Sequence, residues 1–161
     1  MPSSESRHPK HPLGPVVESY RPKHPAKARA VALVAGLAGL ALLAVARTLT
    51  PADAGIGTHQ QLGLPPCSAM RILGIPCPTC GMTTAFSHTV RAQFAAAFLA
   101  QPAGMLFAVA TFLLSWIALF AAISGRMWRI NPYRVSAVHL IWTIVAILLF
   151  GWTIKLIRTM Y

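Results

Sequence analysis

The sequence predicts an all-α membrane protein with about three transmembrane helices and one amphipathic helix at the membrane interface. The 161 residues are 55% hydrophobic and only 11% charged, and long apolar runs are bounded by basic residues. A typical soluble domain carries roughly 25% charged residues. Because so apolar a chain has too little polar surface to face water on all sides, we expect its apolar residues to face lipid.

Residues 30–49 are the first predicted span, an alanine- and leucine-rich run flanked by Arg29 and Arg47. At 1.5 Å per residue this run is slightly short of a ~30 Å hydrocarbon core, and the flanking arginines can extend it by snorkelling. The Ala-Val-Ala at 44–46 resembles a signal-peptidase site, so a cleaved signal peptide is the alternative. The long tail before the run favours an uncleaved anchor.

Residues 1–29 are predicted to be a disordered basic tail in the cytoplasm. Pro-Lys-His-Pro occurs there twice, and proline at this density opposes helix formation. Little apolar surface is present to offset the entropy of ordering. Metal capture by the tail histidines, or recognition of lipid or a partner, is the alternative interpretation.

Two further spans are predicted at residues 102–124 and 135–154. Pro102 suits the first turn of a helix, where its missing N–H costs no hydrogen bond. Asn131 and Pro132 are expected to start the third span in the same way. The remaining predicted segments are a loop with an amphipathic helix at 50–101, a short loop at 125–134 and a tail at 155–161.

The basic residues predict how the chain is oriented. They are densest in the N-terminal tail and in the loop at 125–134, which places both in the cytoplasm and the segment 50–101 outside. Because the basic residues form short clusters beside apolar runs, we expect the lipid bilayer as partner and no nucleic acid. Other membrane proteins, or a second copy of this chain, are the further partners considered.

The acidic residues exclude much familiar enzyme chemistry. Only three are present, and no pair of them is placed to act as acid and base or to hold calcium or magnesium. Phosphate-binding glycine loops, nucleophile elbows and dinucleotide fingerprints are absent from the sequence. We therefore expect a non-enzymatic protein rather than an enzyme.

The cysteine segment is the most distinctive part of the chain, because all three cysteines lie in residues 67–80. Proline after Cys77 predicts a helix that Cys77 caps and Pro78 begins. At helical spacing, one face of this helix then carries Cys80, Thr84, His88 and Arg91. The opposite face carries Met82, Phe86, Val90, Phe94 and Phe98, which makes the predicted helix amphipathic.

The segment also resembles a known family. Cys67, the core Gly-Ile-Pro-Cys77-Pro-Thr-Cys80-Gly-Met-Thr-Thr-Ala, and the later Val-Arg and Gln-Pro pairs resemble a bacterial domain-of-unknown-function family (2752) of small membrane proteins. The resemblance covers roughly residues 64–120, and Thr84 stands where the family usually has arginine. It implies a membrane-bound helical module of the bacterial inner membrane and no particular reaction. The candidate motif residues are Cys67, Cys77, Pro78, Cys80, Gly81, Thr83, Thr84, His88 and Arg91.

Three interpretations of the thiols remain open. Two of them form a structural disulfide that fastens the loop, which suits an oxidising compartment. Alternatively, Cys67, Cys77 and Cys80 bind zinc, although His88 as a fourth ligand would lie about 12 Å along a straight helix from Cys80. In a redox interpretation, the helix dipole activates Cys77 as nucleophile and Cys80 is the resolving thiol.

The function favoured by the sequence is a non-enzymatic accessory or scaffold protein of the bacterial inner membrane with a structural cysteine motif. Its helix would present Thr84, His88 and Arg91 on the surface. The alternatives are a membrane thiol–disulfide protein that uses Cys77 and Cys80, and a zinc-binding membrane module.

Overall fold

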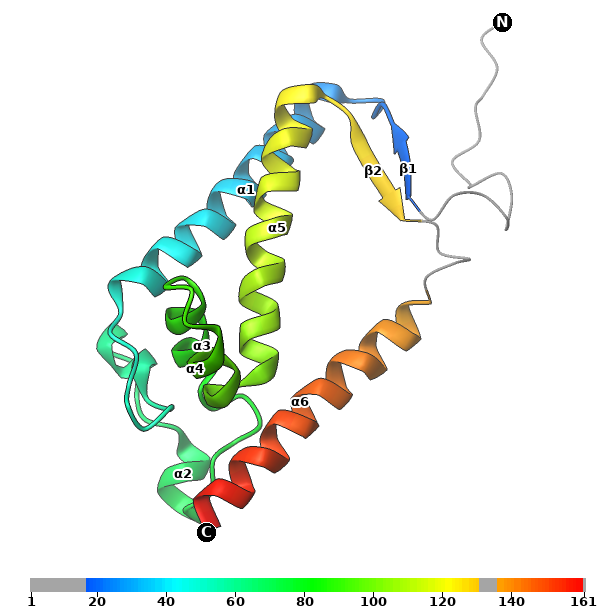
Figure 1. Cartoon of the computed structure of the whole chain (residues 1–161). Coiled ribbons are helices and arrows are strands. Elements are labelled where there is room, and N and C mark those ends of the chain that lie inside the picture. Colours follow the sequence, from blue (N-terminus) through cyan, green and yellow to red (C-terminus); the bar gives the residue numbers. More distant parts are fainter. Residues whose placement is uncertain (1–16, 131–135, 161) are drawn as a thin grey trace, which may run out of the picture.

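The chain is mainly helical in the computed structural model, which describes residues 17–130 and 136–160 (Figure 1). Residues 1–16 of the expected tail, and the expected helix start at Asn131 and Pro132, lie outside the described residues. Three long helices dominate the fold: α1 (Pro25–Thr48), α5 (Pro102–Ser124) and α6 (Ala137–Met160).

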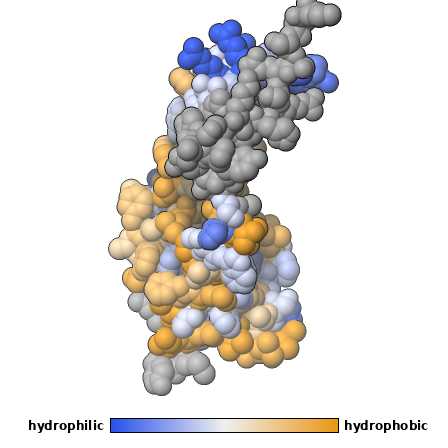
Figure 2. Space-filling model, turned by 90° about the vertical axis from the view of Figure 1, so that its right-hand side faces the viewer, coloured by the Kyte–Doolittle hydropathy of each residue, from blue (hydrophilic) through white to orange (hydrophobic). Residues whose placement is uncertain are grey.

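Each of the three long helices is long and apolar enough to cross a membrane. Large apolar side chains on them remain exposed, among them Val31 at 69%, Leu114 at 62% and Trp142 at 67%. Figure 2 shows apolar side chains over much of one face, with hydrophilic ones gathered at the end that carries the strands. Exposure of this kind is unfavourable in water and favourable in lipid. The predicted all-α class with three spanning-length helices is confirmed.

Helices α1 and α5 pack closely because glycines on α1 meet α5. A Cβ atom added at Gly36 would lie 2.7 Å from the Leu119 Cγ atom, and one at Gly39 would overlap the Ser115 hydroxyl. Small residues let two helix backbones approach to this extent, as is typical of helix pairs in membranes.

At the end of the bundle where the described chain begins, the structure has regular elements that the sequence did not predict. Strand β1 (Val17–Tyr20) pairs antiparallel with β2 (Met127–Ile130). Helix α1 begins at Pro25, earlier than the apolar run, and the Arg29 Nε donates to the Ala122 carbonyl at 2.7 Å. This contact satisfies a carbonyl in the last turn of α5. Residues 17–29 are therefore not the disordered segment that composition indicated.

Four short helices connect α1 to α5 at the opposite end of the bundle: η1 (Thr58–Leu62), α2 (Ser68–Leu73), α3 (Met82–Thr89) and α4 (Phe94–Ala100). The C-terminal end of α6 reaches this same region, whereas β1 and β2 lie at the other end (Figure 1). The cysteine segment thus lies where α6 ends and α5 begins.

The single amphipathic helix expected from Cys77 onward is wrong. The structure has a turn at the cysteines, and α3 begins only at Met82, after Gly81 in a left-handed conformation with φ +86°. Ala92, with φ +58°, interrupts the helix again before α4. Because positive φ values break a helix, the residues assigned to the apolar face are divided between α3 and α4. On the other predicted face, Cys80 and Arg91 lie outside both helices.

Candidate thiol centre

The three cysteines converge although Cys67 is well separated from the other two in sequence. Their Sγ atoms all lie within 4.8 Å of one another, and the Sγ atoms of Cys77 and Cys80 are 3.1 Å apart. Cys67 directly precedes α2, and the other two lie in the turn before α3. All three are free thiols. The structure therefore brings together every thiol that the sequence singled out.

The Cys77–Cys80 segment is a tight turn rather than a helix start. The Cys80 N–H donates to the Cys77 carbonyl at 3.0 Å, and the Met82 N–H donates to the Thr79 carbonyl at 3.1 Å. The turn places both sulfur atoms on the same side. Because α3 begins after Gly81, Cys77 does not cap a helix, and the helix dipole invoked by the redox interpretation does not act on it.

Gly81 is required by this turn for two reasons. Its φ of +86° is a conformation that side chains with a Cβ atom rarely adopt. A Cβ atom there would also lie 2.7 Å from the Gly55 carbonyl oxygen and 2.8 Å from that of Ala100, and it would overlap the Lys155 ammonium. The backbone of Gly81 is thus enclosed by three other segments.

The C-terminal part of α6 holds the cysteine turn from one side. The Lys155 Nζ donates to the Cys80 carbonyl at 2.7 Å, and the Trp152 Nε1 donates to the Pro76 carbonyl at 2.7 Å. Sequence reasoning missed both contacts, because nothing in the local pattern connects residues 75 or more positions apart. Together they fix α6 against the cysteine segment.

A buried glutamine holds the same turn from the start of α5. The Gln101 Nε2 donates to the Pro78 carbonyl at 2.8 Å, and this side chain is only 1% exposed. Sequence analysis noted Gln101 only as part of a family pattern. Its amide now has a physical role, since Pro78 lies between the two cysteines of the turn.

The three thiols differ in their electrostatic environments. The Met70 backbone N–H, and next the thiols of Cys80 and Cys77, lower the pKa of the Cys67 thiol to about 6. Burial is the largest effect on Cys80 and raises the pKa of its thiol to about 12. The Lys155 ammonium also lies close enough to Cys77 and Cys80 to attract negative charge on either sulfur.

The other predicted site residues do not join the thiols. Thr84 is fully buried, and its hydroxyl bonds to that of Thr58 at 2.8 Å, so it is not presented on a surface as expected. The His88 Nδ1 bonds to the Gln93 Oε1 at 2.7 Å. Pro78 is exposed in the turn, and Thr83 is half-buried.

Arg91 closes the end of α1 instead of facing the thiols. Its Nη2 donates to the carbonyls of Arg47 and Leu49, each at 2.7 Å, and its Nη1 donates to the Ser87 carbonyl at 2.7 Å. The last carbonyls of a helix have no partner within the helix. Arg91 therefore has a structural role that joins α3 to α1.

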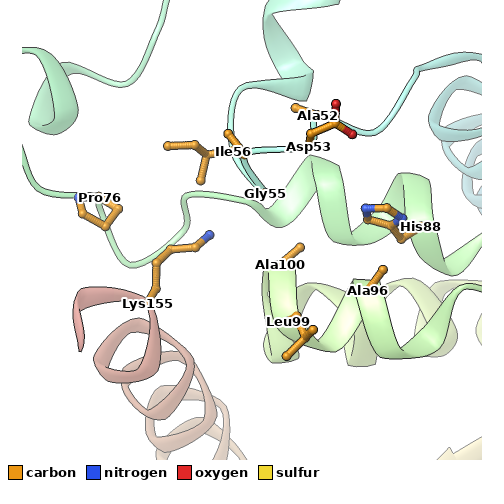
Figure 3. Close-up of a pocket in the computed structure, with 11 residues that line it drawn as sticks. Ala52, Asp53, Gly55, Ile56, Pro76, His88, Ala96, Leu99, Ala100 and Lys155 are labelled. Atoms are coloured by element: carbon orange, nitrogen blue, oxygen red, sulfur yellow. The ribbon is translucent and has the colours of Figure 1, made fainter. Parts of the chain in front are cut away.

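A cavity of about 470 Å³ lies beside the thiol centre (Figure 3). It is bordered by the loop after α1, by α4 and by the end of α6, with Asp53, His88 and Lys155 as its charged or titratable side chains. None of the thiols lines it. The cavity and the thiol centre are therefore neighbouring features that share Lys155 and Pro76.

The cysteine segment was compared with known protein families. Residues 67–116 match the family model described as Protein of unknown function (DUF2752). This segment is therefore similar to that family. The DUF2752 segment begins at Cys67 and contains all three thiols, whereas Trp152 and Lys155, which hold the cysteine turn, lie outside it. Comparison with curated proteins and with solved structures gives no significant match.

Proposed function

We propose that the protein is a non-enzymatic accessory protein of the bacterial inner membrane whose thiol centre binds a thiophilic metal ion, zinc in the first instance. The observation that carries this proposal is the convergence of three Sγ atoms to within 4.8 Å of one another. Thiolate sulfur is the ligand that selects zinc and other soft ions in proteins.

The spacing of the sulfur atoms suits a tetrahedral ion. With Zn–S bonds near 2.3 Å, sulfur atoms around tetrahedral zinc lie about 3.8 Å apart. The Cys77–Cys80 separation of 3.1 Å and the overall limit of 4.8 Å lie on either side of that value. Small rotations of the side chains are then sufficient to bind the ion.

The charge around the centre favours a divalent ion. Three thiolates around a doubly charged ion leave one negative charge, and the Lys155 ammonium is near Cys77 and Cys80 to offset it. A monovalent ion would leave a second negative charge beside the buried Cys80, which is costly where water is excluded.

Elemental analysis of the full chain tests this proposal. We expect protein purified in detergent, under reducing conditions and without chelators, to contain one zinc ion per chain. Cys67→Ser, Cys77→Ser and Cys80→Ser should each lose the metal, while Ser68→Ala, next to Cys67, should retain it. The proposal would be overturned if reduced protein contained no zinc and did not take up one zinc ion per chain when zinc was added.

A thiol–disulfide function is the second candidate, and the 3.1 Å separation of the Cys77 and Cys80 sulfur atoms favours it. A small movement would bring them to the disulfide length of about 2.05 Å. In that reaction the two thiols give two electrons and two protons to a substrate disulfide. The variant Cys80→Ser should then trap a mixed disulfide on Cys77, whereas the metal proposal predicts that no such adduct accumulates.

We further propose that the N-terminus faces the cytoplasm. Exposed basic residues gather at the end of the bundle with β1 and β2: Arg21, Lys23, Lys27, Arg29 and Arg126. At the thiol end, Arg47 and Arg71 are the exposed basic residues in the described part of the chain, while Arg91 and Lys155 are half-buried and donate to backbone carbonyls. The excess of unburied positive charge at one end supports this orientation by the positive-inside rule. Lipid is then the principal partner of the three long helices.

A further inference from the structure

The thiol centre offers three protein ligands in the part of the chain that the structure describes. Its group of potential metal ligands consists of Cys67, Cys77 and Cys80, with no other cysteine, histidine or acidic residue of the described ranges within it. His88 and Asp53 border the neighbouring cavity instead. A tetrahedral ion held here would therefore have one position not filled by these side chains.

The free position has a defined direction. Cys80 is buried, whereas Cys67 and Cys77 are partly exposed. On the Cys80 side the centre is closed by the contacts of Lys155 and Gln101 with the cysteine turn. On the other side, both residues that flank Cys67, Pro66 and Ser68, are exposed, as is Pro78 after Cys77, whereas Pro76 before Cys77 is buried. The open position thus faces outward, between Cys67 and Cys77.

The ligand that suits this position is a thiolate rather than a water molecule activated for hydrolysis. Three thiolates donate strongly to the ion and weaken its action as a Lewis acid, and hydrolytic zinc sites use mainly imidazole and carboxylate ligands instead. Among the described residues, no carboxylate belongs to the cluster of three cysteines, so none is placed to serve as a base. A soft ion in a sulfur-rich setting prefers sulfur as its next ligand.

We infer that the metal ion of this centre keeps an outward-facing fourth position that takes an exogenous thiolate. This inference rests on the proposed function. On binding, the incoming thiol would release its proton to solvent, and its sulfur would replace a water molecule on the ion. No atom changes oxidation state. The thiol comes from a small cellular molecule or from a partner's cysteine.

Cobalt substitution tests this inference, because cobalt absorption bands report the number and type of ligands. The full chain in detergent is loaded with Co²⁺ and titrated with glutathione in one arm and with a cysteine-containing peptide in the other. We expect a saturable shift of the bands, with a further sulfur-to-cobalt contribution. A shift with glutathione would show that a small thiol is sufficient to fill the fourth position. A shift with the peptide alone would show that the position takes a protein thiol.

Two outcomes separate this inference from the proposed function. If cobalt binds through the three cysteines and neither thiol shifts the bands, the inference of an open thiolate position is overturned while the metal centre stands. If cobalt does not bind to the reduced chain, both are overturned. His88→Ala is the control variant: it should leave the spectrum and its response to thiols unchanged. A changed spectrum, with a thiol response that only this variant shows, would mean that His88 closes the site and would overturn the inference.

Discussion

The thiol centre contains three chemically identical side chains in three different surroundings. Cys67 is partly exposed near the Met70 N–H, Cys77 begins a tight turn, and Cys80 is buried beneath it. The sequence was sufficient to select these cysteines, since all of them lie close together and none occurs elsewhere. Their surroundings were not predictable, because these depend on contacts from Gln101 and Lys155.

The difference between Cys67 and Cys80 predicts their order of modification in reduced, metal-free protein. Because the Met70 N–H lowers the pKa of the Cys67 thiol to about 6, this thiol is mostly ionised at neutral pH. Burial raises the pKa of Cys80 to about 12 and keeps it protonated. Since the thiolate is the nucleophile, iodoacetamide should modify Cys67 first.

The pH dependence checks this assignment. The rate at Cys67, followed by mass spectrometry of its peptide, should fall as the pH decreases through about 6, because the thiolate becomes protonated. Modification of Cys80 before Cys67 would contradict the assignment.

Gly81→Ala should destabilise the cysteine turn. The added methyl group would clash with the Gly55 and Ala100 carbonyl oxygens. In addition, alanine at this positive φ costs roughly 1–2 kcal/mol by itself. We expect a lower temperature of unfolding in detergent and a loss of bound metal. Gly74→Ala is the matched control, because Gly74 has a similar φ of +70° but no atom within 4 Å of an added Cβ. Equal effects of the two substitutions would show that the enclosure of Gly81 is unimportant.

At the scale of helices, the long apolar elements were predictable and the short ones were not. An uninterrupted apolar run specifies a spanning helix by itself, and α5 follows such a run, with Pro102 at its start. The predicted amphipathic helix failed because periodicity does not reveal the positive φ values at Gly81 and Ala92. These two residues divide the sequence into a turn, α3 and α4.

The arginine contacts at helix ends also lay beyond sequence reasoning. Arg29 of α1 satisfies the end of α5, and Arg91, in the turn between α3 and α4, satisfies the end of α1. From the sequence, an arginine beside an apolar run is equally consistent with a lipid anchor and with a residue that binds the end of another helix. Only the packing of the helices shows which carbonyls it meets.

Arg91→Ala should therefore separate α3 from the end of α1. The lost contacts are charge-assisted hydrogen bonds to backbone carbonyls, each worth roughly 1.5–3 kcal/mol. We expect a lower free energy of unfolding, measured by denaturant titration in detergent. Arg71→Ala, at an exposed position in α2, should change it by no more than about 0.5 kcal/mol. An unchanged free energy of unfolding in Arg91→Ala would contradict the structural role given to this residue.

The whole molecule has two chemically distinct ends joined by apolar helices. One end contains β1, β2 and the exposed basic residues, and the other contains the thiol centre and the end of α6 (Figure 1). The number of spans and the grouping of the segments at the two ends were predictable from hydropathy and connection lengths. The pairing of β1 with β2 was not, because two four-residue strands carry almost no local signal.

Labelling from outside the cell tests the proposed orientation. In a chain whose three cysteines are replaced by serine, Leu64→Cys at the thiol end should react with a membrane-impermeant maleimide in intact spheroplasts. Ser19→Cys in β1 should react only after permeabilisation, because the basic end is expected in the cytoplasm. The reverse pattern would contradict the orientation and leave the fold unaffected.

The zinc K-edge X-ray absorption spectrum of the purified full-length protein tests the central claim most directly, because it reports the atoms bound to the metal. We expect a shell containing three sulfur atoms at about 2.3 Å from zinc. A shell of nitrogen and oxygen atoms alone, around zinc that the cysteine-to-serine variants still bind, would contradict it.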